Sequence, residues 1–104
     1  MWKTLLVDAD EDHARRVLAL LHRRALGIDL YESGEAAVQM LQRTRASYDV
    51  VIINATAPCK EVFLTLKQLQ ELCLSARFLC VSSVNHGPLY RLRIERLGAR
   101  FVYE

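Results

Sequence analysis

Three short apolar runs, each followed by a longer amphipathic stretch, limit the folds that are open to this chain. The runs lie at residues 4–7, 50–53 and 78–81. They are apolar at successive positions, which is typical of strands buried on both faces in a parallel sheet. Helices between such strands form repeated βα units. The sequence therefore predicts an α/β fold.

Weaker signals complete the predicted sheet and place four helices. Two further strands are expected at 28–31, as an edge strand, and at 100–103. Apolar residues at three- and four-residue spacing predict helices between them. The first runs over about 12–26 and stops at Gly27, and the second begins at the N-cap residue Ser33. The third carries an inward stripe ending at Cys73, and the fourth begins at Pro88.

The length and composition bound the remaining classes. A chain of 104 residues, 52% hydrophobic and 25% charged, has room for one domain, 1–104, with one core. No apolar run approaches the roughly 18 residues of a membrane span. The first residues lack the pattern of a secretory signal, so we expect a cytoplasmic protein. The last third of the sequence is basic. A solvated helix face explains this best, an acidic protein partner comes second, and a nucleic-acid partner is a distant third.

The three cysteines do not form a metal or disulfide motif. Cys59, Cys73 and Cys80 are odd in number and have no CxxC spacing, as expected for free thiols in a reducing compartment. Cys80 lies within a predicted strand and is expected to be buried. No metal site is predicted.

Polar residues follow the three strongest strands. In an open parallel sheet, ligands bind beyond the carboxyl ends of the strands. Those ends carry Asp8, Asn54 and Ser82. The sequence therefore predicts that these three side chains share one site.

At these positions the chain resembles response-regulator receiver domains over essentially its whole length. Residues 7–13 resemble the first strand and acidic loop of that family, and 48–58 resemble its third strand with the following proline. Ser82 falls where the family has Thr or Ser, and Leu97-Gly98-Ala99 precedes the last strand as Ala-Gly-Ala does there. The resemblance implies a flavodoxin-like, doubly wound sheet of five parallel strands in the order 2-1-3-4-5.

Working receivers transfer a phosphoryl group to an aspartate with the help of Mg²⁺, and this chain departs from their pattern. The acceptor position is Asn54, a poor nucleophile without charge, and Ala9 replaces one of two acidic residues. Asp10 could substitute for it but is better explained as a helix-start charge. Glu104 stands where the family has lysine if the preceding loop is one residue short. The expected vestigial phosphoacceptor pocket comprises Asp8, Asp10, Asn54, Ser82 and Glu104, without catalytic residues or a cofactor and with only weak Mg²⁺ binding.

Other uses of a similar sheet fit less well. A nucleotide or flavin site needs a loop that cradles phosphate after the first strand, whereas this loop is acidic. Cobalamin domains use Asp-x-His-x-x-Gly there, and the residues around His13 fail at both ends. His13 is therefore predicted to be a surface residue at a helix start. Hydrolase motifs are absent from the sequence.

Two functions remain open. The first is a pseudo-receiver that is not an enzyme, signalling by binding a protein partner or a fused effector domain in signal transduction or transcriptional regulation. The second is a phosphotransfer receiver, inactivated by an engineered Asp-to-Asn change or using atypical chemistry. With either function, we expect the domain to be the N-terminal part of a longer regulator or a truncated chain.

The resemblance also implies an interaction face. Receiver domains have a fifth helix beside the first, and none is predicted here, so one sheet face should be open. We expect self-association through it, or a helix borrowed from a partner or from sequence beyond residue 104. The residues expected on the interaction face are Leu89, Leu92, Arg93, Arg96, Phe101 and Tyr103.

Overall fold

The computed structural model describes residues 2–21, 25–56 and 60–103. Strands and helices alternate along the chain, as the sequence predicts. The strands are β1 (Trp2–Val7), β2 (Ala25–Tyr31), β3 (Val50–Asn54), β4 (Arg77–Ser82) and β5 (Arg100–Tyr103). The helices are α1 (Glu11–Leu21), α2 (Gly34–Thr44), α3 (Lys60–Leu72) and α4 (Pro88–Arg96). None of the described helices is long and apolar enough to cross a membrane.

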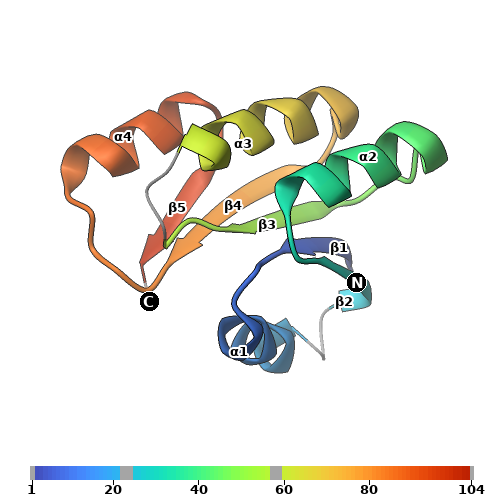
Figure 1. Ribbon diagram of the computed structural model, residues 1–104, viewed down its shortest axis with the longest axis horizontal. Helices are drawn as coiled ribbons and strands as arrows, with labels where there is room; N and C mark the ends of the chain where they lie inside the picture. Colours follow the sequence, from blue (N-terminus) through green and yellow to red (C-terminus); the bar gives the residue numbers. More distant parts are fainter. Residues whose placement is uncertain (1, 22–24, 57–59, 104) are drawn as a thin grey trace.

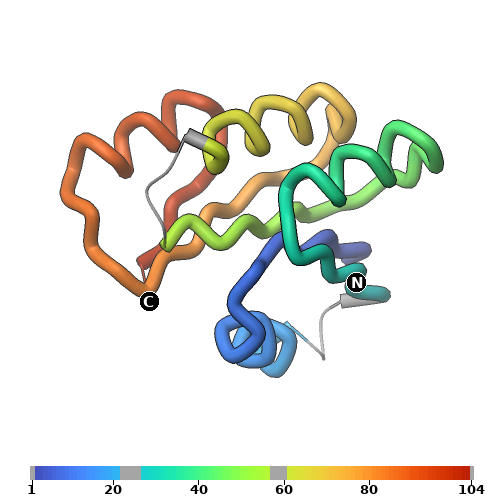
Figure 2. Tube along the Cα trace, viewed as in Figure 1, coloured from blue at the N-terminus to red at the C-terminus, as the bar shows by residue number. Residues whose placement is uncertain are grey.

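The five strands form one parallel sheet in the order β2-β1-β3-β4-β5. This order confirms the predicted flavodoxin-like fold. Helices α2, α3 and α4 lie on one face of the sheet, and α1 is the only described helix on the other (Figure 1). The chain path in Figure 2 shows the same two unequal layers.

Each face of the sheet has its own apolar core. The larger core lies under α2, α3 and α4 and includes Leu5, Val51, Leu66 and Ile94. The smaller core lies under α1, where Leu6 and Ile52 pack against Ala14 and Val17. Successive residues of β1 and β3 thus enter opposite cores, which explains the continuous apolar runs of the sequence.

The predicted helix boundaries agree with the structure except at the end of the first helix. Ser33 caps α2, since its hydroxyl accepts a hydrogen bond from the amide of Ala36 at 3.1 Å, and Pro88 is in the first turn of α4. The prediction that the first helix reaches Leu26 is wrong, because β2 already begins at Ala25. Ala25 follows Leu21 at helical spacing, so its position in the sequence is compatible with a helix or a strand. Its pairing with Trp2 of β1 makes it part of the strand.

The described thiols are structural. Cys73 and Cys80 are buried and free, and burial raises the pKa of the Cys80 thiol to about 12. It also raises the pKa of Cys73. Both therefore stay protonated and pack as small apolar side chains, as predicted for Cys80. Cys59 lies outside the described residues.

Gly34 permits the close approach of α2 to α3. A Cβ atom at this position would lie 2.0 Å from Thr65 Oγ1 and 2.8 Å from Thr65 Cβ. We expect Gly34→Ala to lower the free energy of unfolding by about 1–3 kcal/mol, because rotation of Thr65 cannot move its own Cβ away. Denaturant unfolding measures the loss. Gly27→Ala is the matched control, since a Cβ there meets nothing within 4 Å. Thr65→Ala should partly restore the stability of the Gly34 variant.

Candidate functional site

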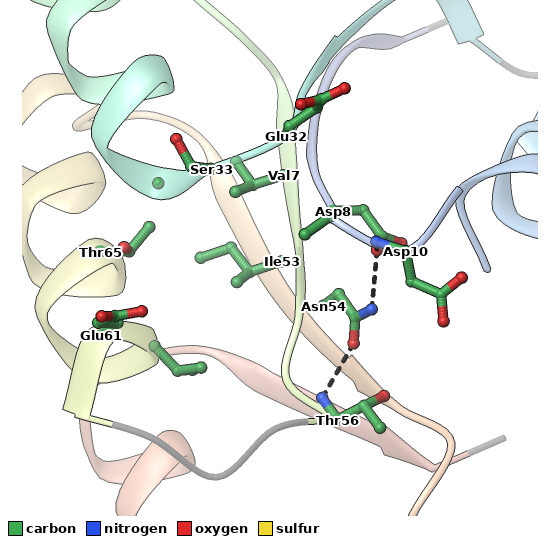
Figure 3. Close-up of a pocket in the computed structure, with 13 residues that line it drawn as sticks. Val7, Asp8, Asp10, Glu32, Ser33, Ile53, Asn54, Thr56, Glu61 and Thr65 are labelled. Atoms are coloured by element: carbon green, nitrogen blue, oxygen red, sulfur yellow. Dashed lines mark hydrogen bonds between the residues drawn. The ribbon is translucent and has the colours of Figure 1, made fainter. Parts of the chain in front are cut away.

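The predicted site lies at the carboxyl ends of β1 and β3. Asp8 follows β1 directly, and Asn54 is the last residue of β3. Both line a cleft of about 440 Å³ between these strand ends and the start of α2 (Figure 3). The parallel pairing of β1 with β3 places these strand ends side by side, as the sequence predicts.

Asn54 is hydrogen-bonded into the site rather than projecting freely into it. Its Nδ2 donates to Asp8 Oδ1 at 2.8 Å, and its Oδ1 accepts from the amide of Thr56 at 2.9 Å. Figure 3 shows these two bonds on either side of the Asn54 side chain, one toward Asp8 and one toward Thr56. An amide fits this position because it can donate to a carboxylate on one side and accept on the other, whereas an ionised aspartate could only accept.

Asp8 receives donors on both of its oxygens. Oδ1 also accepts from the amide of Asp10 at 2.9 Å, and Oδ2 is paired with Nδ1 of His13. An ionised carboxylate can take part in such a bond only as the acceptor, with the histidine nitrogen as the donor. The side chains of Asp8 and His13 are 0% and 1% exposed, so the pair is shielded from water.

The surface position predicted for His13 is wrong. His13 is on the first turn of α1, on the side that also carries the buried Ala14 and Val17. The spacing of four residues to Val17 is the signal that could have placed it. The polarity of histidine outweighed that signal, and nothing in the local sequence reveals its partner five residues earlier.

Asp10 and Ser82 serve local structure. Asp10 Oδ1 accepts from the amide of His13 at 3.1 Å, at the start of α1, which agrees with its interpretation as a helix-start residue. Ser82 is buried, and its hydroxyl donates to the carbonyl of Val84 at 2.6 Å and accepts from the amide of Val84 at 3.0 Å. Ser82 does not line the described cleft. Glu104 lies outside the described residues.

The cleft is acidic. Asp8, Asp10, Glu32 and Glu61 line it, and none of its described lining residues is a lysine or arginine. An anionic ligand such as a phosphoryl group would be repelled by these carboxylates. Among the described residues, no group of three or more His, Cys, Asp or Glu side chains is arranged to hold a metal ion.

A second set of hydrogen bonds joins the end of β3 to α4. Tyr90, on α4, donates its hydroxyl to the carbonyl of Ala55 at 2.9 Å, and the His86 ring contacts the carbonyl of Thr56. The amide of Ser83 donates to Thr56 Oγ1 at 3.1 Å. Thr56 is also bonded to Asn54, and its neighbour Ala55 accepts the bond from Tyr90, so the site is linked to α4 through this short segment.

The predicted interaction residues divide between two places. Leu89, Leu92, Arg93 and Arg96 are exposed on α4, and Tyr103 is exposed on β5. Arg93 also lies over the Phe63 ring, 4.2 Å from its centre. The four α4 residues lie on the sheet face that α2, α3 and α4 cover, and Tyr103 lies on the edge strand β5. The other sheet face carries α1, and no other described helix covers its remaining strands (Figure 1).

The placement of Phe101 on the open face is wrong. Its ring packs edge-on against Tyr90, with centroids 5.9 Å apart, in the core under α4. Strand alternation then directs Val102 to the opposite, α1 side of the sheet, where it is 38% exposed. The sequence predicted that the two side chains point in opposite directions but not which one meets α4.

Comparisons with known proteins give the fold and no closer relationship. No protein-family model matches the sequence, and no curated protein matches it significantly. The receiver domain of the Francisella response regulator 1452 is 18% identical, with a TM-score of 0.79, over 100% of this chain and 84% of that one. Chemotaxis protein CheY4 of Vibrio cholerae is 21% identical, with a TM-score of 0.76, over 98% and 84%.

A third similar structure shows the chemistry that this fold can carry. It is a response regulator protein from Burkholderia pseudomallei with a phosphorylated aspartic acid, a calcium ion and citrate, 14% identical with a TM-score of 0.82. The match covers 98% of this chain and 59% of that one. At these identities the likeness shows that this chain has the receiver fold.

Proposed function

We propose that this chain is a receiver-type signalling domain that is not phosphorylated and acts by binding other proteins. The observation that carries the proposal is the state of Asp8. Both of its oxygens are occupied by donors from within the chain, namely His13, Asn54 and the amide of Asp10. The position where a receiver would gather a cation and an acceptor carboxylate is therefore filled by a closed network.

This network opposes each requirement of phosphotransfer. The acceptor needs a carboxylate nucleophile, and Asn54 offers an amide whose oxygen is already bonded to Thr56. Magnesium needs about six oxygen ligands and gives up its water reluctantly. Asp8 could join such a shell only by losing its bond to His13, which would leave a buried imidazole beside a divalent cation. The proposed domain is therefore not an enzyme and needs no cofactor.

The proposed output is protein binding, to a separate partner or to a fused effector domain. The fold supports this reading, as do the hydrogen bonds between Asn54 and Thr56 and between Tyr90 and Ala55, which link the site to α4. The alternative is a phosphotransfer receiver with an engineered Asn54 or with atypical chemistry. A change of the acceptor residue alone would not account for the buried Asp8–His13 pair. This pair therefore favours the non-phosphorylated domain over the phosphotransfer receiver.

Incubation with Mg²⁺ and a small phosphodonor separates the two functions. We expect no mass gain of a phosphoryl group in the intact protein, and amide shifts of Asp10, Asn54 and Thr56 that do not saturate below millimolar Mg²⁺. Trp2 fluorescence is unsuitable as a reporter, since Trp2 is at the opposite end of β1 from the site. A stable phosphoryl adduct, or saturation at sub-millimolar Mg²⁺, would contradict the proposal.

A further inference from the structure

The register of the sheet creates an apolar surface on the α1 side of β3, β4 and β5. Pairing places Ile52 beside Leu79, and Val81 beside Val102. Leu79 and Val81 are half-buried and Val102 is exposed. We call the surface formed by Val50, Leu79, Val81 and Val102 the β3–β5 face.

The β3–β5 face has the width of one helix. Neighbouring strands lie about 4.8 Å apart, so the axes of β3 and β5 are about 10 Å apart. A helix with its side chains is about 10 Å across. On this side, α1 packs on Leu6 and Ile52, and it leaves the adjoining strip without a helix among the described residues (Figure 1). Parallel strands are ordinarily covered on both faces, so this strip is suited to a further helix.

The rim of the face is basic. Arg77 and Arg100, the first residues of β4 and β5, are both exposed, and neither forms an ion pair with another described residue. Both line a groove of about 870 Å³ that also contains Trp2, Leu79 and Gly98. The acidic residue of this groove, Asp49, already accepts a hydrogen bond from the amide of Lys3 at 2.9 Å.

We propose that the β3–β5 face binds an amphipathic helix of a partner protein, with acidic residues flanking its apolar stripe. The inference rests on the proposed function and names the partner's chemistry. Acidic flanks complement Arg77 and Arg100, while leucine-like side chains cover Leu79, Val81 and Val102. Two copies of this chain joined through the same face would instead bring four arginines together with only one acidic residue, Asp49, from each copy. Like charges across an interface are unfavourable, so a second copy fits less well.

A pair of designed helical peptides tests the charge and shape of the site. Both carry the same leucine stripe over 18 residues, and one has glutamate flanks where the other has lysine. Trp2, the single tryptophan, is half-exposed in the groove and reports binding by its fluorescence. We expect the glutamate peptide to bind at least about 10-fold more tightly at low salt, with the difference shrinking as salt screens the arginines.

Variants identify the surface. Val102→Asp should abolish binding of the glutamate peptide, while Leu64→Asp, at an exposed position on α3 on the opposite side of the sheet, should leave it unchanged. Arg77→Glu with Arg100→Glu should reverse the preference to the lysine peptide, and circular dichroism verifies that each variant is folded. Equal binding of both peptides, or full binding to a folded Val102→Asp protein, would overturn the proposal.

Sedimentation of the free chain tests the competing occupant. We expect a monomer at low micromolar concentration. A dimer that Val102→Asp dissociates would assign the face to a second copy and overturn the partner-helix proposal. None of these measurements involves a phosphodonor or Mg²⁺, so their failure would leave the proposed lack of phosphorylation unaffected.

Discussion

Replacing His13 with leucine is expected to lower the free energy of unfolding by about 3–5 kcal/mol. The change leaves the Asp8 carboxylate buried, with one of its oxygens deprived of a charge-stabilising donor. A small domain has only about 5–15 kcal/mol of total stability, so the loss is a large part of it. Urea denaturation followed by circular dichroism measures the difference at the midpoint.

Two further variants show whether the loss comes from the Asp8–His13 pair. Asp8→Asn removes the buried charge, so His13→Leu should cost about 1–2 kcal/mol less in that background. Arg15→Ala is the control on the same helix. Its ion pair with Glu11 is 2.7 Å long but exposed, and it should contribute less than about 1 kcal/mol. If His13→Leu proved as harmless as Arg15→Ala, the pair would not be what stabilises the site.

The fold could be predicted from the sequence because its strands carry independent signals. Residues 50–53 and 78–81 are apolar on both faces, and both form central strands of the parallel sheet. The resemblance to receiver domains implied the order of the strands, and the observed pairing of neighbouring strands confirms it. The end of α1 was harder to predict, since the residues that follow it are compatible with helix or strand until pairing with β1 is known.

The site could be predicted only as a location. Parallel strands bring Asp8 and Asn54 to one edge of the sheet whatever their side chains do, so their proximity was predictable. The direction of each side chain was not. His13 is buried because its helix turns that side toward Asp8, and Phe101 meets Tyr90 because α4 packs over one face of β5. Both outcomes depend on the packing of whole elements rather than on local pattern.

Replacing Asn54 with aspartate is expected to destabilise the domain at pH 7 rather than to create a working acceptor. The 2.8 Å bond from Nδ2 to Asp8 Oδ1 would become a contact between two carboxylate oxygens. At an effective dielectric constant of about 20, this repulsion is about 6 kcal/mol before any relaxation. Side-chain rotation and proton uptake relieve part of it, so we expect a net loss of about 2 kcal/mol in the free energy of unfolding.

The pH dependence of the Asn54→Asp variant identifies this repulsion. Its folded carboxylate pair takes up a proton more readily than the unfolded chain does, so the variant should gain stability, relative to the chain with Asn54, between pH 7 and pH 5. Asn54→Ala removes the same hydrogen bond without adding charge, and its deficit should not change over that range. Adding Ala9→Asp to Asn54→Asp should recover Mg²⁺ binding before it recovers phosphorylation, since the acidic Glu32 and Glu61 still line the cleft. Rapid labelling of the single Asn54→Asp variant by a phosphodonor would instead support a receiver that lost only its acceptor.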